Sequence, residues 1–313
     1  FFLVWKTAPP RGGGGEGGAA WDSSFSKDGL LVAAAGGMNV KVLHTSDGSL
    51  KMRLRGHKAH VVRVSFTSVF KRVAAAASDR QLIVWSSESG EPMFHWQERM
   101  RVTGLSFSPD SDLCVGGNGE FGLWGEASSR SSNRKTGAVV NCCSWSTDGA
   151  RVVLGMEDGR VSVREVGGRE SYAWSVDGSV VSAAWNETKD GSGSARGGRA
   201  PNAWNVFLTT KDGVVRYFRL MHGGKSEEVT ELGEKLEKKV LGATLLQATG
   251  HLVVAADGNT AHLHAYGDIV QMCELKSTIV SMVVHASVVA NPLIAIGCDN
   301  GALHVYKLVG NAI

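Results

Sequence analysis

The chain has 313 residues, of which 43% are hydrophobic and 20% charged, with 40 glycines, 6 prolines and 9 tryptophans. This composition is typical of a globular protein rich in tight turns, and it excludes a disordered or fibrous chain. The formal net charge of +3, from 33 basic and 30 acidic residues, is too balanced to predict a polyanionic partner.

One unit recurs along the whole chain: an apolar strand, a polar turn, a second strand, an Asp/Asn-Gly turn, and a third strand that closes on a bulky residue. The closing residues are spaced by 42, 39, 40, 54, 45 and 43 positions, and are Leu43, Trp85, Trp124, Arg164, Phe218, Leu263 and Tyr306. Short strands at this even spacing, with a fourth outer strand per unit, predict an all-β chain that forms a single seven-bladed WD40-type β-propeller.

The turn residues repeat as regularly as the closing residues. Six positions before each closing residue lie Gly37, Asp79, Asn118, Asp158, Asp212, Asp257 and Asn300, and five of these are followed by glycine. A tight hairpin needs a residue with positive φ at this point, and Asp-Gly or Asn-Gly supplies it. The repetition makes the propeller interpretation specific.

In chain order, residues 1–6 form a hydrophobic start and residues 9–18 a flexible Pro- and Gly-rich connection. Six blades follow at 19–55, 59–97, 101–136, 138–176, 179–233 and 239–275. The seventh, 278–308, lacks an outer strand of its own. We expect the run from Phe1 to Lys6 to pair with it, because this closes the ring and covers an open sheet edge.

Two inserts interrupt the regular spacing. Residues 186–201 are rich in Gly, Ser, Lys and Arg, and the composition of 187–201 predicts a flexible segment. Residues 227–239 alternate acidic and basic side chains and are expected to form a short helical turn between blades five and six. The third unit offers only the polar stretch 128–136 as an outer strand.

The second blade retains most of the WD signature: Gly56-His57 before its first strand, Asp79 in the turn and Trp85 at its close. In such repeats the histidine, aspartate and tryptophan form a buried hydrogen-bonded chain that holds the strands together. The serine that usually joins them is Ala75 here. The remaining blades are degenerate, so their stability is expected to come mainly from apolar packing between blades.

A basic stripe is the candidate interaction surface. Lys51, Arg53 and Arg55 alternate along the outer strand of blade one with Leu50, Met52 and Leu54, so the three charges are expected to point one way. They could dock an acidic partner. Alternatively, they protect an exposed sheet edge from unwanted strand pairing, and we prefer this simpler interpretation.

The sequence carries no recognisable catalytic pattern. A nucleophile elbow, a phosphate-binding loop ending in lysine, HExxH and paired carboxylates next to strands are all missing. His262 and His264 would share one strand face, but no third metal ligand accompanies them. We therefore predict neither an enzyme nor a bound metal or cofactor.

The cysteines and the apolar stretch 278–296 have simple explanations. The five cysteines, which lack CxxC spacing, are expected to be buried thiols in a reducing compartment: Cys114, Cys142, Cys143, Cys273 and Cys298. The apolar stretch is interrupted by His285 and by the turn signal Asn291-Pro292, so it predicts two buried strands rather than a membrane span. Because the chain starts at Phe1, we interpret it as a fragment of a longer protein.

With the blades placed, particular residues resemble one family, the intraflagellar transport protein 122 family of WD-repeat subunits. The resemblance is most specific at 121–124, 141–149, 154–156 and 159–164, where Arg164 closes a blade as it does in the family. These matches lie in the first of the family's two N-terminal propellers. The second propeller and the helical-repeat tail are absent from this sequence, and the glycine run 12–18 departs from the family pattern.

The resemblance implies a non-catalytic scaffold in intraflagellar transport complex A, acting in return transport along cilia or flagella and in the entry of ciliary membrane proteins. The implied partners are the other subunits of that complex and cargo adaptors, at the cilium or flagellum and basal body, on the cytoplasmic side. Neither nucleic acid binding nor direct membrane insertion is expected.

The alternative function is a generic WD-repeat module for substrate recognition or nucleic-acid association. Such a module would gather basic side chains on one rim of the ring. The residues that discriminate are Arg99, Arg101, Arg130, Arg134 and Lys135.

Overall fold

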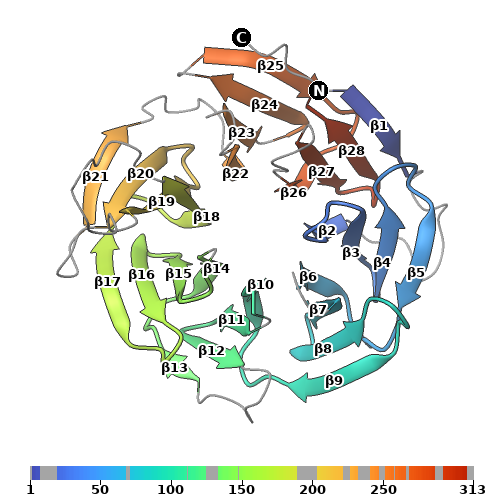
Figure 1. Cartoon of the computed structure of the whole chain (residues 1–313), viewed down its shortest axis with the longest axis horizontal. Helices are drawn as coiled ribbons and strands as arrows, with labels where there is room; N and C mark the ends of the chain where they lie inside the picture. The colour runs from blue at the N-terminus through green and yellow to red at the C-terminus, as the bar shows by residue number, and fades with distance from the viewer. Residues whose placement is uncertain are drawn as a thin grey trace, which may run out of the picture.

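The computed structural model describes residues 2–7, 20–67, 71–110, 112–124, 133–146, 148–188, 203–220, 226–231, 240–246, 251–256, 258–265, 268–285 and 292–308. Within these ranges, 28 strands form seven four-stranded antiparallel sheets that stand as blades around one axis (Figure 1). Six of the sheets are each built from four consecutive strands. The seventh combines the first strand of the chain with the last three.

In the six blades built from consecutive strands, the strands follow one another from the axis outward in chain order (Figure 1). The first three blades contain β2 (Ala20–Phe25), β3 (Leu31–Gly36), β4 (Asn39–His44) and β5 (Leu50–Leu54); β6 (Val61–Phe66), β7 (Arg72–Ala77), β8 (Gln81–Ser86) and β9 (Pro92–Gln97); and β10 (Val102–Phe107), β11 (Leu113–Gly117), β12 (Glu120–Trp124) and β13 (Arg134–Lys135). The fourth contains β14 (Val140–Trp145), β15 (Arg151–Met156), β16 (Arg160–Glu165) and β17 (Glu170–Ser175).

The remaining blades follow the same order. The fifth contains β18 (Val180–Thr188), β19 (Ala203–Thr210), β20 (Val215–Leu220) and β21 (Ser226–Glu231), and the sixth contains β22 (Val240–Leu246), β23 (His251–Ala256), β24 (Thr260–Ala265) and β25 (Asp268–Glu274). The seventh contains β26 (Ile279–His285), β27 (Leu293–Cys298), β28 (Leu303–Lys307) and, as its outer strand, β1 (Phe2–Lys6). In the described part of the chain no helix is long and apolar enough to span a membrane.

The start of the chain joins the two ends of the ring. β1 runs antiparallel to β28, with Phe2 opposite Lys307 and Lys6 opposite His304. The seal extends to blade one, where the indole N–H of Trp5 donates to the carbonyl of Thr45 at 2.8 Å. The edge of β28 is therefore covered by a strand that also contacts the neighbouring blade, as expected for a propeller that closes without a covalent link.

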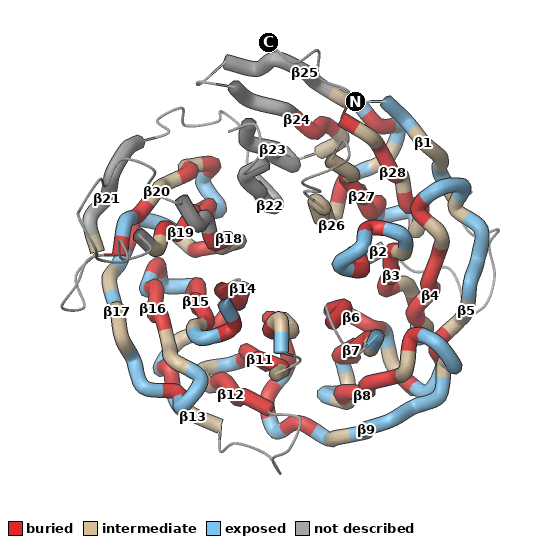
Figure 2. Tube along the Cα trace, viewed as in Figure 1, coloured by how far each residue is buried: buried red, intermediate tan, exposed pale blue. Residues whose placement is uncertain are grey.

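Apolar side chains fill the spaces between neighbouring blades. One cluster joins blade one to blade two through Val40, Val42, Val61, Val64 and Trp85, all nearly or fully buried. Figure 2 shows that the middle strands β3, β7 and β15 are mostly buried, whereas the outer strands β5 and β9 are largely exposed. The apolar side chains of each blade are thus buried by packing against the neighbouring blades.

Hydrogen bonds between the inner strands of neighbouring blades, each with a side chain as donor or acceptor, add to this packing. The backbone N–H of Val64 donates to Asp22 at 2.9 Å, and that of Phe66 donates to Ser24 at 3.1 Å. Further round the ring, the Trp145 indole donates to the Ser106 carbonyl at 3.0 Å, and the Trp185 indole to that of Ser144 at 2.8 Å. These bonds cross from blade to blade and fix the relative height of adjacent sheets.

The turns between second and third strands show why the sequence repeats Asp/Asn-Gly. Gly119, Gly159, Gly213, Gly258 and Gly301 all have positive φ. In blade two the same position is held by Arg80, with a φ of 70°, and the Asp79 carboxylate accepts the N–H of Gln81 at 3.1 Å. A side-chain oxygen that accepts the N–H two residues ahead stabilises such a turn.

In blade three the outer strand β13 covers Arg134–Lys135 of the polar stretch 128–136, and residues 128–132 lie outside the described residues. Two local predictions are wrong. Residues 227–231 belong to β21 and not to a helical turn, since pairing with β20 satisfies their backbone groups. The segment 187–201 was expected to be flexible, but Glu187 and Thr188 belong to β18 and pair with β19. Residues 189–201, like 9–18 and 232–239, lie outside the described residues.

Candidate functional site: a groove between blades one and two

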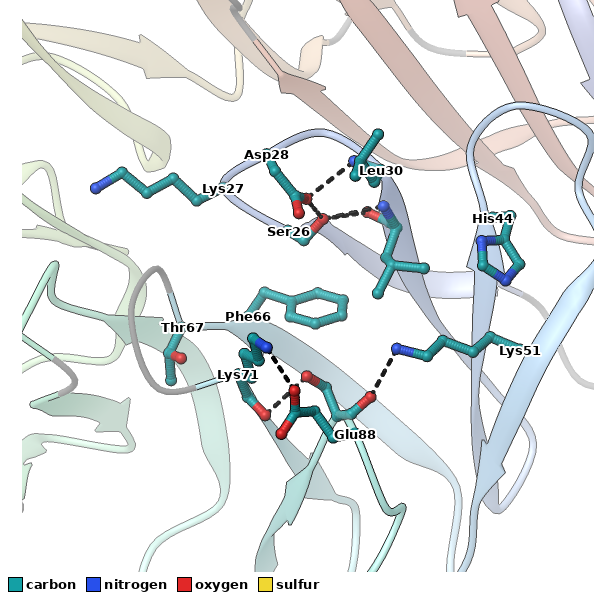
Figure 3. A pocket seen from close by; sticks show the side chains of 12 residues that line it. Ser26, Lys27, Asp28, Leu30, His44, Lys51, Phe66, Thr67, Lys71 and Glu88 are labelled. Atoms are coloured by element: carbon teal, nitrogen blue, oxygen red, sulfur yellow. Dashed lines mark hydrogen bonds and ion pairs between the residues drawn. The ribbon is translucent and has the colours of Figure 1, made fainter.

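A groove of about 500 Å³ lies between blades one and two, on the face of the ring that carries the β2–β3 and β4–β5 turns. We call this the groove face. Blade one contributes Ser26, Lys27, Asp28, Leu30, Leu31, His44 and Lys51, and blade two contributes Phe66, Thr67, Lys71, Ser87 and Glu88. Figure 3 shows the ring of Phe66 between the Asp28 turn on one side and Lys71 and Glu88 on the other.

The wall from blade one is a rigid turn. The Ser26 hydroxyl donates to Asp28 at 2.5 Å, and the backbone N–H groups of Leu30 and Leu31 donate to Asp28 and Ser26 at 3.0 Å. Although partial burial raises the pKa of Asp28, the hydrogen bonds from Ser26 and Leu30 outweigh it, and the pKa is lowered overall. Asp28 is therefore an ionised carboxylate that accepts hydrogen bonds from Ser26 and Leu30 of the same turn.

The wall from blade two carries an exposed ion pair. Lys71 and Glu88 form a salt bridge, and their side chains are 68% and 63% exposed. Hydrogen bonding and charge attraction between the two raise the pKa of Lys71 and lower that of Glu88. Lys51 reaches across from blade one and donates to the Ser87 carbonyl at 3.0 Å. The groove is thus bordered by cations on both blades.

The predicted basic stripe has a different geometry from the one expected. A register shift between Val42 and Leu43 places Met52 opposite Val42 and Leu50 opposite Leu43, so Lys51 sits in a β-bulge. The bulge breaks the alternation: Leu50 is 51% exposed, although it was expected on the buried face with Leu54. Lys51 turns into the groove, whereas Arg53 lies opposite Lys41 within the sheet. The role of the stripe stays a prediction.

The WD residues of blade two come together in space. The rings of His57 and Trp85 meet edge to face at 5.5 Å, and the Trp85 indole donates to the Arg55 carbonyl at 3.1 Å. Burial lowers the pKa of His57 to about 4, although the negative charge of Asp79 acts in the opposite direction. The complete hydrogen-bonded chain through His57, Asp79 and Trp85 stays a prediction.

Arg164, in the place where other blades close on a hydrophobic residue, makes a polar network instead. Its guanidinium donates to Ser162 at 2.8 Å and pairs with Glu170 at 2.6 Å, and the Ser162 hydroxyl donates to Glu170 at 2.6 Å. The same guanidinium lies over the ring of Phe121 in blade three, 5.5 Å from its centroid. The arginine therefore joins two blades as a large apolar side chain would.

Of the five cysteines, Cys114 and Cys298 are buried as expected, whereas Cys142, Cys143 and Cys273 are only partly buried. Cys142 contacts the cluster between blades four and five, whereas Cys143 contacts the one between blades three and four. Burial raises the pKa of the Cys142 thiol to about 12. Among the described residues no three His, Cys, Asp or Glu side chains are placed to hold a metal ion. His262 is buried, and the side chain of His264 lies outside the described residues.

The basic residues chosen to discriminate between functions do not converge on one rim. Arg99 and Arg101 lie in the link between β9 and β10. Arg134 leaves the outer strand β13 and lies against Gly168 in the β16–β17 turn of the next blade, while Lys135 is exposed beside it. Arg130 lies outside the described residues. This arrangement does not favour a recognition module with a basic rim.

Comparison with known families gives a match that covers nearly the whole ring. Residues 19–307 match the family described as the IFT122 first beta-propeller. The chain belongs to this family. The match starts at blade one and ends within β28, so only β1 among the described strands precedes it.

Individual relatives of the IFT122 family support the same assignment. The chain is 33% identical to the intraflagellar transport protein 122 homolog of Danio rerio over 175 residues, which cover 54% of this chain and 15% of that protein. It is 31% identical to the Homo sapiens homolog over 166 residues, 53% and 13% of the two chains. The matched region therefore spans about a seventh of the length of these relatives.

A solved structure is similar to the IFT122-type propeller in fold alone. The beta-propeller domain of Cps50 (Swd1) from Myceliophteria thermophila superposes with a TM-score of 0.77 at 13% identity, covering 98% of this chain and 99% of that one. At this identity the likeness shows the architecture and carries no functional argument.

Among the groove residues, only Lys51 was singled out by the sequence analysis. Lys27, Leu30, Phe66, Lys71 and Glu88 belong to no recognisable motif. The available signal was the Ser-x-Asp-Gly turn at 26–29, which occurs again at 146–149 with the same Ser-to-Asp hydrogen bond. A turn built in this way leaves the following side chain, here Leu30, at the surface.

Proposed function

We propose that this domain is a non-catalytic docking platform of intraflagellar transport complex A in ciliary or flagellar transport. The observation that carries the proposal is the match of residues 19–307 to the first propeller of IFT122. The relatives carry intraflagellar transport in their names. Return transport and the entry of membrane proteins are the processes in which we place it.

The structure supports a platform through its surface. The outer strand β5 carries Lys51 and Arg53, Arg55 follows directly after its last residue, and the groove between blades one and two opens beside it. We propose this region for contact with other subunits of the complex or with cargo adaptors, on the cytoplasmic side of the cilium and basal body. Edge protection by the same cations is compatible with this role, since a charged edge rejects strands but accepts acidic side chains.

Live imaging tests the proposed function. A fluorescent fusion of the full-length protein should move in both directions along the cilium or flagellum, and replacing this propeller with an unrelated one should stop the return movement. A fusion that stays diffuse in the cell body, or a propeller replacement that leaves return velocities unchanged, contradicts the proposal.

A further inference from the structure

The groove combines an exposed apolar lip with a hydrophobic floor. Leu30 is 64% exposed at the tip of the β2–β3 turn, while the ring of Phe66 is almost entirely buried below it. Leu31, at the start of β3, is half-buried between them. A leucine as exposed as this beside an aromatic floor offers apolar surface that a bound side chain would remove from water.

The charges around this apolar surface are mainly positive. The Asp28 carboxylate is directed at its own turn by the bonds from Ser26 and Leu30. Lys51 donates one of the three N–H groups of its ammonium to the Ser87 carbonyl, which leaves two N–H groups for another acceptor. The Lys71–Glu88 pair is solvent-exposed, and such pairs contribute only about 0–1 kcal/mol. Both lysines can therefore turn to a bound carboxylate at little cost.

The groove continues into a second basic region. The bulge at Lys51 leads from the groove to the outer strand β5, and Arg55 lies exposed just beyond the end of that strand. Lys41, opposite Arg53 on β4, adds a further cation to the same sheet. A ligand that fills the groove and extends along β5 thus meets cations from both parts of this surface, Lys51 and Lys71 in the groove and Arg55 beyond β5.

We propose that the groove binds a short linear peptide in which one large apolar side chain is flanked by aspartate or glutamate. The apolar side chain would lie over Phe66 against Leu30 and Leu31, and the carboxylates would pair with Lys51 and Lys71. The volume of about 500 Å³ holds a few side chains and not a folded domain. An anionic lipid headgroup would use the lysines but leave the aromatic floor unused, so the peptide is the better fit.

The inference rests on the proposed platform function but is tested with the 313-residue chain itself. A library of short random peptides is selected on this chain, and the enriched peptides are measured by fluorescence polarisation on two double variants. Lys51→Glu with Lys71→Glu reverses the charge of the groove. Lys211→Glu with Lys276→Glu makes the same change at exposed lysines in the β19–β20 turn and the β25–β26 link, which lie on the opposite face.

If the proposal is correct, the selection enriches peptides in which acidic residues flank a Leu, Phe, Met or Trp. Their affinity should fall by about tenfold or more in the groove variant, weaken with added salt, and stay unchanged in the control variant. Leu30→Ser, at an exposed position that folding tolerates, should weaken the same peptides.

Three results would overturn the proposal: no enrichment of acidic-apolar peptides, equal binding to the groove and control variants, or binding of the groove to anionic phospholipid vesicles and not to peptides. Each leaves the platform function intact, because that function is tested by movement of the full-length protein.

Discussion

The closure of the ring can be tested at a single contact, where Trp5 of β1 lies on Gly48 of blade one. Gly48 has a φ of +74°, and a Cβ added to it would come 2.6 Å from a carbon of the Trp5 indole. Gly48→Ala must therefore displace the indole or shift the turn. Trp5→Ala removes the same indole directly, together with its hydrogen bond to the Thr45 carbonyl.

The expected magnitudes follow from these contacts. Gly48→Ala costs about 1 kcal/mol for the left-handed backbone alone. Displacing the indole adds the loss of a hydrogen bond, about 1 kcal/mol, and of part of the burial of a half-buried tryptophan, about 1–2 kcal/mol. Trp5→Ala alone should destabilise by about 2–3 kcal/mol on the same reasoning. In the double variant the indole is absent and its displacement costs nothing more, so the two effects should fall short of additivity by about 2–3 kcal/mol.

Urea denaturation followed by far-UV circular dichroism gives the free energy of unfolding of the unchanged protein, the two single variants and the double variant. It does not rely on tryptophan fluorescence, which Trp5→Ala would change. Gly119→Ala is the matched control, because Gly119 has a φ of +73° and no atom within 4 Å of an added Cβ. It should cost about 1 kcal/mol and be additive with Trp5→Ala. If the losses in the free energy of unfolding caused by Gly48→Ala and Trp5→Ala were additive, the contact between Trp5 and blade one would be refuted.

Three further predictions concern other blades. Arg80→Gly should leave stability unchanged or raise it by up to about 1 kcal/mol in the same denaturation assay, because Arg80 has a φ of 70°; a loss above that would show that its side chain matters more than its backbone. The pKa of His57 falls from 6.5 to about 4 on folding, so between these pH values the unfolded chain binds more protons than the folded chain. The free energy of unfolding should therefore drop as the pH falls from 6.5 to 4. Denaturation at a series of pH values should show a smaller drop for His57→Phe. Arg164→Lys should destabilise by about 1–2 kcal/mol, because lysine cannot reproduce the contacts to Ser162, Glu170 and Phe121 at once; an unchanged melting temperature would contradict the bridging role.

Much of the architecture could be predicted from the sequence, because it depends on turns that need particular residues at particular positions. Positive φ at Gly159 or Gly301 needs glycine after Asp or Asn, and the closing residues recur at fixed offsets from these turns. The leftover hydrophobic start likewise had one sheet edge available to it. These features depend on residues that are close in sequence or that repeat.

The candidate site was harder to predict, because it arises between blades. Phe66 and Leu30 are 36 residues apart and meet only when two sheets pack side by side. The bulge at Lys51 exposes Leu50 and turns a lysine into the groove, and a strict alternation of strand residues cannot anticipate it. Arg164 was recognised as unusual, but its stacking on Phe121 depends on the adjacent blade.

The most direct test of the account is affinity purification of the tagged full-length protein from ciliated or flagellated cells, with quantitative mass spectrometry. The account predicts that subunits of intraflagellar transport complex A are recovered together with the protein, and that replacing this propeller reduces the recovery of at least one of them. Purification that yields no ciliary transport subunit would contradict the central claim.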